Sequence, residues 1–198
     1  MKKLNFNESY TLENEVALLR PLRMEDFETL LPYSINEPTL WQYSLVSAGG
    51  GAEQMRHYMN LAMDKKAKQD SYPFIVFDKR SNEYAGSTRF YDYQAHHNTV
   101  QLGYTWYGKK FWGTRLNKNC KFLMLQFAFE TLGLDRVEFR ADNNNARSIA
   151  AMKSLGCKVE GVLRQNCAAP EGRRDSIILS ILKEEWFGGV GEQLLERC

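Results

Sequence analysis

One stretch of the chain combines glycines, basic residues and the expected start of a helix. A strand should end near Tyr107, a loop with Gly108 and Gly113 follows, and a helix begins around Thr114. The first N–H groups of a helix lack partners within it and lie at the positive end of its dipole. Three basic residues lie nearby, namely Lys109, Lys110 and Arg115. A pyrophosphate would fit here, but so would an ordinary strand-to-helix turn with surface lysines.

A second helix start follows another expected strand. Asn145 and Ser148 lie in its first turn, just after a strand expected over residues 136–141. In mixed sheets, ligands bind outside the carboxyl ends of strands, where neighbouring strands diverge. Two helix starts and a strand end are therefore expected to face one crevice. Taken alone, Asn145 and Ser148 would be explained as capping residues.

Hydrophobic periodicity predicts the elements that position these residues. Strands are expected over 16–22, 73–77, 84–91, 99–107, 136–141, 158–163 and 176–182, and helices over 24–34, 52–68, 114–131 and 145–155. A turn over 170–173 should join the last two strands. Short connections imply antiparallel neighbours, whereas the strand–helix–strand unit over 99–141 must pair in parallel. The predicted fold class is α/β (α+β), with a mixed, mostly antiparallel central sheet of about seven strands and flanking helices.

The composition fits one globular domain. The chain has 198 residues, of which 43% are hydrophobic and 25% charged, and no repeat or linker divides it. We expect a single domain, 1–198, with its core over about 16–182 and a short C-terminal tail. No apolar run reaches the roughly 18 residues of a membrane span, and the first residues do not form a secretory signal, so a cytoplasmic location is expected. The net charge of +2 is too small to favour nucleic acid or an acidic membrane.

Other reactive residue types form no clear site in the sequence. The cysteines Cys120, Cys157, Cys167 and Cys198 have no metal-ligand spacing and are expected to be reduced thiols. No metal is therefore predicted. His96 and His97 fall in an expected turn and should be solvated. Gly49-Gly50-Gly51 lacks the Gly-Lys-Ser/Thr that would make it a phosphate loop.

Two further groups are candidates for contact with a substrate. The aromatic group consists of Trp41, Tyr43, Tyr91 and Tyr93. Such residues line pockets, but they more often fill cores. Arg173 and Arg174 lie in the late turn, where a surface position is expected and contact with a substrate carboxylate is the lesser alternative.

Several short motifs together resemble one family. They are Leu102-Gly103-Tyr104, Trp112-Gly113-Thr114, Leu132-Gly133, Arg136-Val137-Glu138, Asn145-x-x-Ser148 and Leu155-Gly156-Cys157-x-x-Glu160-Gly161. In this order and spacing they resemble the GNAT superfamily of N-acetyltransferases, in the RimJ/RimL-like branch that includes ribosomal-protein alanine acetyltransferases. The similarity runs over about residues 16–182, and the element order of that family matches the one predicted above.

The resemblance implies transfer of an acetyl group from acetyl-CoA, a cosubstrate, to a primary amine. The acceptor would be a protein N-terminal α-amine or a small molecule, and a homodimer is plausible. Trp106 and Tyr107, at the end of a splayed strand, would pair through their backbone with the pantetheine arm. Backbone amides of the following loop would hold the pyrophosphate: Trp112, Gly113, Thr114, Arg115, Leu116 and Asn117. Asn145 would hydrogen-bond the pantetheine, and Ser148 would lie near the thioester sulfur.

The chain departs from the family pattern in its phosphate loop. The family's loop runs Gln/Arg-x-x-Gly-x-Gly/Ala, and the matching positions here are Trp112, Arg115 and Asn117. Asn117 and Lys121 resemble a variant of this branch, whereas Arg115 is unusual there. A non-catalytic acyl-CoA-binding protein is therefore an alternative. A nucleotide or RNA module is disfavoured by the modest charge and by the lack of a Walker loop.

The catalytic groups are only partly defined by the sequence. Many relatives use a tyrosine in the helix over 145–155 to protonate the leaving thiolate, but this helix has none. Ser148 is the remaining candidate. For the base that deprotonates the amine, three carboxylates are candidates: Asp92, Glu138 and Glu160. An α-amine, with a pKa of about 8, needs less help than a lysine amine at about 10.4.

Overall fold

The computed structural model describes residues 3–169 and 172–198. Its strands are β1 (Leu12–Glu13), β2 (Ala17–Pro21), β3 (Ser71–Asp78), β4 (Glu83–Gln94), β5 (Thr99–Tyr107), β6 (Arg136–Asp142), β7 (Lys158–Ala169) and β8 (Gly172–Leu182). Its helices are α1 (Phe27–Asn36), α2 (Ala52–Ala67), α3 (Leu116–Gln126), α4 (Ala146–Ser154), α5 (Lys183–Glu185) and α6 (Gly191–Leu195). The short turns are η1 (Met24–Asp26), η2 (Pro38–Trp41), η3 (Lys109–Phe111), η4 (Phe127–Thr131) and η5 (Trp186–Val190).

The strands form one mixed sheet in the order β1-β2-β3-β4-β5-β6-β8-β7. Only β5 and β6 pair in parallel among the described strands, as the strand–helix–strand unit predicted, and the other neighbours are antiparallel. The sheet has eight strands rather than about seven, because β1 pairs with β2 over two residues. A strand that short leaves no alternating pattern to detect in a sequence.

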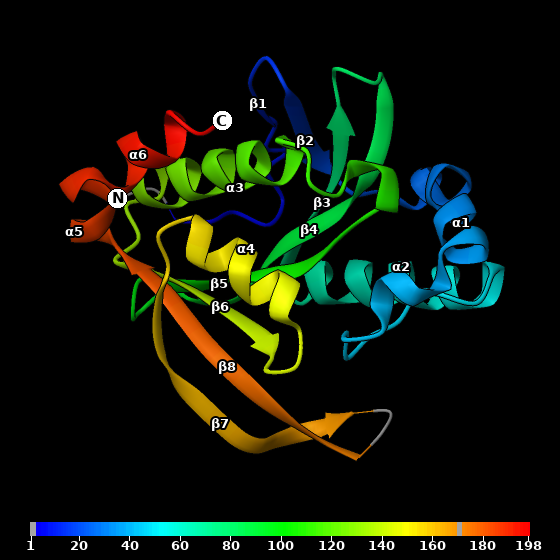
Figure 1. Cartoon of the computed structure of the whole chain (residues 1–198). Coiled ribbons are helices and arrows are strands. Elements are labelled where there is room, and N and C mark those ends of the chain that lie inside the picture. The colour runs from blue at the N-terminus through cyan, green and yellow to red at the C-terminus, as the bar shows by residue number, and fades with distance from the viewer. Residues whose placement is uncertain (1–2, 170–171) are drawn as a thin grey trace.

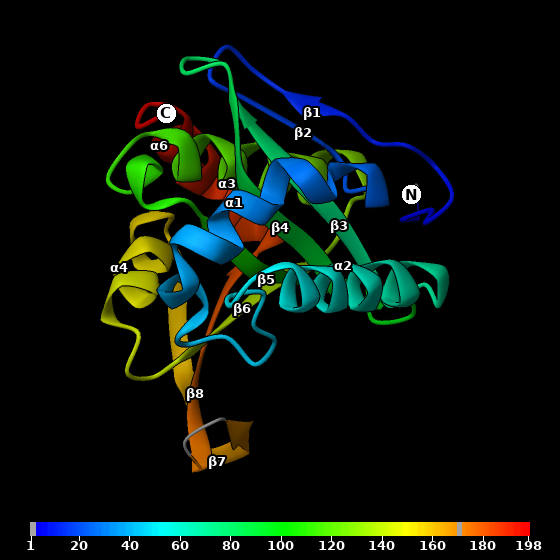
Figure 2. The ribbon, with the colours of Figure 1, turned by 90° about the vertical axis from the view of Figure 1, so that its right-hand side faces the viewer.

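Helices cover both faces of the sheet. Figure 2 shows α1 and α2 in front of the strands and α3 behind them. One hydrophobic cluster joins the first two helices to the sheet through Ile75 and Trp106. A larger cluster on the opposite face contains Leu116 and Cys120 of α3 and Met152 of α4. The two faces of β5 and β6 therefore meet different helices.

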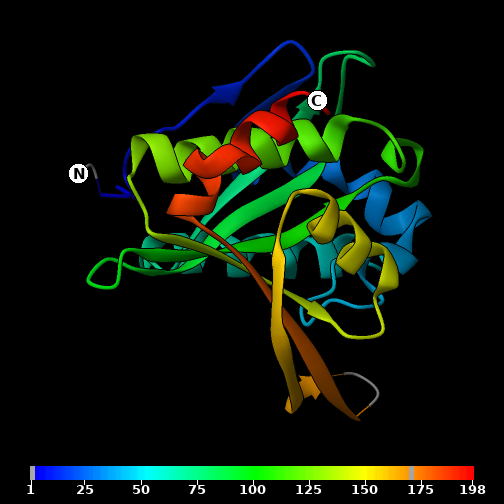
Figure 3. The same cartoon turned by 60° about the vertical axis from the view of Figure 1, so that its left-hand side comes forward.

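The hydrophobic core extends beyond the predicted limits of 16 and 182. Phe6 and Tyr10 are buried near one end of the chain, and Trp186 and Leu194 near the other. Figure 3 shows that α6 lies along α3. The segment expected as a short tail thus contributes to the layer that positions α3.

Two elements differ from their predicted lengths. The helix expected over 114–131 begins at Leu116, and its last part widens into the π-helical turn η4. The hairpin β7–β8 is much longer than predicted and projects below the sheet (Figure 1). Of the predicted turn, Pro170 and Glu171 lie outside the described residues. Within the described chain, we find no helix with the length and apolarity that crossing a bilayer demands.

Candidate active site

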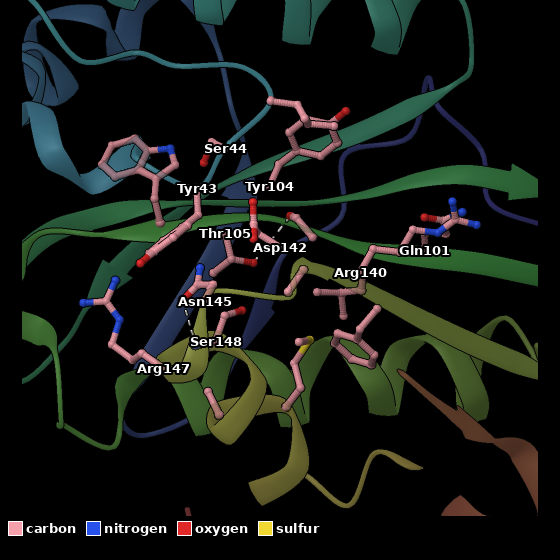
Figure 4. Close-up of a pocket in the computed structure, with 18 of the residues that line it drawn as sticks. Tyr43, Ser44, Gln101, Tyr104, Thr105, Arg140, Asp142, Asn145, Arg147 and Ser148 are labelled. Atoms are coloured by element: carbon pink, nitrogen blue, oxygen red, sulfur yellow. Dashed lines mark hydrogen bonds between the residues drawn. The ribbon is translucent and has the colours of Figure 1, made fainter. Parts of the chain in front are cut away.

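A cavity of about 680 Å³ lies where β5 and β6 separate. These strands pair only between Thr99–Gln101 and Arg136–Glu138. Beyond that point, β5 continues beside β4 as far as Tyr107, while β6 continues beside β8 as far as Asp142. Each strand thus follows its antiparallel neighbour away from the other. The divergence exposes backbone between them, and Figure 4 shows side chains from both strands around the opening.

A bulge in β5 bends the strand at this opening. The register between β4 and β5 shifts between Ser87 and Arg89, so that Tyr104 and Thr105 lie opposite Thr88 alone. Tyr104 adopts a left-handed conformation with φ of 49°, which is uncommon for a non-glycine residue. Bulges of this kind increase the local bend and interrupt pairing. The bulge therefore lies in the part of β5 that has separated from β6.

The strand end offers backbone, not side chains, to a ligand. The Trp106 side chain is buried against Trp41, and its indole nitrogen donates to Tyr58 Oη at 3.1 Å. The neighbouring Tyr107 side chain packs in the core on the opposite face. Both residues line the cavity, which is compatible with the predicted backbone pairing.

The loop before α3 forms one wall. Trp112 Nε1 donates to the carbonyl oxygen of Tyr107 at 2.9 Å, which ties the loop to the end of β5. Gly113 has φ of 72°, a conformation that favours glycine, and no atom of the described residues, apart from its chain neighbours, lies within 4 Å of the place where a Cβ would stand. Arg115 and Leu116, whose backbone amides were also expected at the pyrophosphate, do not line the cavity. Leu116 is buried in the core, and the Arg115 guanidinium donates to the Cys198 carbonyl oxygen at 3.4 Å.

The start of α4 forms the opposite wall. Asn145 is the N-cap, and its Oδ1 accepts from the Ser148 backbone N–H at 3.1 Å, as the capping interpretation predicted. Both side chains also line the cavity. The Asn145 Nδ2 has no hydrogen-bond partner within residues 3–169 and 172–198, so it is available to a ligand. Capping and ligand binding therefore do not compete for the same atom.

The predicted site residues mostly come together. The cavity is lined by Trp106, Tyr107, Trp112, Gly113, Thr114, Asn117, Asn145 and Ser148. Two helix starts and a strand end thus face one crevice, as the sequence predicted.

Of the three carboxylates proposed as bases, only Asp92 lines the cavity. Its two oxygens accept hydrogen bonds at 2.6 Å from the side chains of Gln94 and Gln101. Glu138 forms ion pairs with Arg136 and Arg140. Glu160 forms a bidentate pair with Arg136, which lowers the pKa of its carboxyl. Because both glutamates are paired with arginines and neither lines the cavity, neither fits the role of base.

Lys121 is a cavity residue whose chemistry the sequence did not reveal. It lies on α3, is only 5% exposed, and lines the cavity. Burial lowers the pKa of its amine to about 7. One signal in the sequence could have indicated that Lys121 is buried: it is the one charged residue between positions 119 and 129. Periodicity alone cannot say that such a lysine turns inward, because a lysine stem also packs beside apolar neighbours while its amine reaches water.

Several discounted or weaker candidates are also resolved by the structure. Tyr43, Tyr91 and Arg174 line the cavity, whereas Trp41, Tyr93 and Arg173 do not. His96, His97 and the three glycines at 49–51 lie outside it as well. All four cysteines are unpaired. Among the described residues, no group of three histidines, cysteines or carboxylates is arranged to hold a metal.

Comparisons with known proteins agree with this geometry. The model of the "Acetyltransferase (GNAT) domain" family matches residues 17–158. The curated "Uncharacterized N-acetyltransferase p20" of Bacillus licheniformis is 25% identical over 90% of this chain and 99% of its own length. The "Putative ribosomal N-acetyltransferase YdaF" of Bacillus subtilis is 32% identical over 45% of this chain and 48% of its own length.

A solved structure extends the match to the fold. The crystal structure of a "putative acetyltransferase" from T. thermophilus is 31% identical, covers 94% of this chain and 96% of its own, and superposes with a TM-score of 0.84. The family match over residues 17–158 includes the diverging strands and the two helix starts. The chain belongs to the GNAT family of acetyltransferases.

Proposed function

We propose that this acetyltransferase moves the acetyl group of acetyl-CoA to the neutral α-amine of a peptide or protein N-terminus. The observation that carries the proposal is the divergence of β5 and β6 directly between the starts of α3 and α4. Unpaired backbone of β5 is available to the amides of the pantetheine arm, as a sheet edge is to an added strand. The start of α3 presents N–H groups and a positive dipole to the pyrophosphate.

The coenzyme would occupy the side of the sheet covered by α3 and α4. The cavity wall on this side includes Asn117 of α3 and Asn145 and Ser148 of α4. Asn145 Nδ2 would donate to a pantetheine carbonyl. The thioester would then lie near Ser148, at the narrow end of the opening between the strands. Arg115 would not obstruct the phosphates, because its side chain is directed to the carbonyl of Cys198.

The acceptor would enter from the opposite face. There the cavity is lined by Tyr43 and Ser44 after η2, by Tyr104 of β5, and by Asn166 and Arg174 of the long hairpin. An extended peptide end would lie among these residues. The likeness to YdaF, named for ribosomal N-acetylation, supports a protein acceptor.

Asp92 is the proposed base for the attacking amine. Its carboxylate lies in the cavity, fixed by Gln94 and Gln101. An α-amine has a pKa of about 8, so a substantial fraction is neutral near neutral pH and little proton abstraction is needed. Asp92 would take the remaining proton through water.

The test combines coenzyme binding with an acceptor series. Calorimetric titration with acetyl-CoA should give a Kd in the micromolar range, worth about 8 kcal/mol. Release of coenzyme A should then be followed with peptides that carry a free α-amine, with the same peptides blocked at that amine, and with peptides in which only a lysine amine is free. Turnover confined to free α-amines supports the proposal. Binding without turnover on any amine would instead favour a non-catalytic acyl-CoA-binding protein.

A further inference from the structure

Lys121 lines the cavity on the side proposed for the coenzyme, and its amine is buried there. Its Nζ donates to Thr105 Oγ1 at 2.6 Å and to Thr88 Oγ1 at 3.0 Å. The two hydroxyls lie 2.8 Å apart, so the three groups form a closed triangle. The threonines come from β4 and β5 at the bulge, which lies beyond the point where β5 and β6 stop pairing. The amine is thus held at the strand divergence rather than at the protein surface.

No carboxylate balances the charge of this amine among the described residues. The ionisable groups that face it are the thiols of Cys120, on its own helix, and Cys157, after α4. Burial raises the pKa of both thiols to about 12, so they remain neutral. The strands contribute only the two threonine hydroxyls. An ammonium buried without a counter-ion loses its proton readily, which explains the lowered pKa.

The wall of α4 that lines the same cavity contains few proton donors. After the N-cap residue Asn145, the residues of this wall that line the cavity are Arg147, Ser148, Ala151, Met152 and Leu155. Arg147 stacks on Trp112 at the outer end, and a guanidinium does not release its proton in proteins. A serine hydroxyl is too weak an acid to supply a proton by itself, although it can pass one on. Lys121 is the cavity group on this side that titrates near neutral pH.

We propose that Lys121 is a catalytic residue that protonates the thiolate of coenzyme A as it leaves. This inference rests on the acetyl transfer proposed above. The acceptor nitrogen attacks the thioester carbon, the tetrahedral intermediate collapses, and the C–S bond breaks with its electron pair on sulfur. The ammonium of Lys121 gives a proton to that sulfur, directly or through the Ser148 hydroxyl. The neutral amine then regains a proton from solvent once coenzyme A has left.

The acidity of this amine suits the step. A thiol has a pKa of about 8.5, so transfer from an ammonium with a pKa of about 7 is favourable. An ordinary lysine, near 10.5, would hold its proton too tightly. General acids work best when their pKa lies near the working pH. Burial without a carboxylate partner is what brings Lys121 into this range.

The test follows the thiol of bound coenzyme A, so it needs no acceptor. Its titration is read from the ultraviolet absorbance of the thiolate in the complex with the full chain, with the S-methyl-coenzyme A complex as blank. Lys121→Met retains the apolar stem and removes the amine, and Lys121→Gln retains a polar group for the two threonines. Lys118→Met is the matched control, because Lys118 is on the same helix but outside the cavity. Circular dichroism confirms that each variant is folded.

The expected result is a thiol that titrates below its free value in the wild type, because thiolate and ammonium form a coupled pair. Lys121→Met and Lys121→Gln should raise that apparent pKa by about one unit or more, and Lys118→Met should leave it unchanged. With an active acceptor, Lys121→Met should also lower kcat about 100-fold or more at an unchanged Kd for acetyl-CoA. Identical thiol titrations in wild type and Lys121→Met, with coenzyme bound to both, would overturn the role of Lys121 alone. Failure of the wild type to bind coenzyme A would instead overturn the coenzyme site and this inference with it.

Discussion

The Arg147 guanidinium lies over the ring of Trp112, with its central carbon 3.4 Å from the ring centroid. This contact joins the start of α4 to the loop before α3, which are the two walls of the cavity proposed for the coenzyme. A cation over an indole contributes about 0.5–2 kcal/mol, depending on its exposure. The pair therefore helps to set the spacing of the two helix starts.

We expect Arg147→Met to weaken acetyl-CoA binding about three- to tenfold, because the two helix starts lose this contact.

Trp112 is 39% exposed, whereas the other three tryptophans are buried. Coenzyme binding should therefore change tryptophan emission mainly through Trp112, and Trp112→Phe should abolish that change. Calorimetry measures the affinity of Arg147→Met, and fluorescence titration measures the emission of wild type and Trp112→Phe. An emission change that persists in Trp112→Phe would contradict this place for the ligand.

Asn145 should have two separable roles. Asn145→Ala loses both the cap of α4 and the free amide, so it should lower the free energy of unfolding by about 1 kcal/mol and weaken acetyl-CoA binding. Asn145→Asp retains a capping oxygen for the Ser148 N–H but cannot donate through Nδ2. It should keep the stability and still weaken binding. Equal affinity in wild type and Asn145→Asp, measured by calorimetry, would show that Asn145 only caps the helix.

Ser148→Ala should lower turnover with little change in the Kd for acetyl-CoA, because the hydroxyl acts at the sulfur rather than in holding the coenzyme. Ser154→Ala is the control on the same helix. Its hydroxyl donates to the Ala151 carbonyl and does not line the cavity. Steady-state kinetics with an active acceptor provide the measurement. Turnover of Ser148→Ala at the wild-type rate would rule out this role.

Asp92→Asn should reduce kcat about 100-fold or more if its carboxylate accepts the amine proton. The loss should shrink as the pH rises and more acceptor amine becomes neutral. Glu160→Gln is the matched control. It removes a carboxylate that is paired with Arg136 outside the cavity, so kcat should not change. The pH dependence of kcat for both variants checks this, and equal kcat values would exclude Asp92 as the base.

Stability should depend on pH through Lys121. Its pKa is about 7 in the folded chain, against an ordinary 10.5. Between these values the unfolded chain binds a proton that the folded chain does not, so the free energy of unfolding rises with pH, by up to about 1.4 kcal/mol per unit. Below pH 7, Lys121 is protonated in both the folded and the unfolded chain, so the full cost of burying its charge lowers the free energy of unfolding.

Urea unfolding of wild type and Lys121→Met, compared from pH 7 to 9, isolates this contribution from other titrating groups. As the pH rises, the free energy of unfolding of the wild type should increase relative to that of Lys121→Met. A difference that stays constant over this range would mean that the Lys121 amine is not buried as described.

Local patterns were sufficient for most elements. The strand over 99–107 was predicted with the bounds observed for β5, and the helix after Asn145 was predicted with its cap. These signals act over a few residues: alternation of side chains on a strand, and an amide oxygen that accepts a helix N–H. The parallel pairing of β5 and β6 also followed, because an intervening helix enforces it. The strand β1 has only two residues and the burial of Trp186 depends on distant residues, so no short-range pattern in the sequence predicted either.

The chemistry of the site depended on long-range packing. Asp92, Glu138 and Glu160 were equivalent candidates in the sequence, and only the arrangement of strands placed the first in the cavity and paired the other two with arginines. Arg174 lines the cavity because the long hairpin β7–β8 extends to it.

By itself, the sequence determined the fold class, the family and the two helix starts that face one crevice, because periodicity, caps and motif spacing are written in adjacent residues. Only the tertiary structure decided where β5 and β6 part and which ionisable groups lie between them. It also decided the protonation of Lys121, since a pKa depends on how far a group is removed from water and on the charges near it. The amine of Lys121 is buried and bonded to Thr88 and Thr105, which come from other parts of the chain.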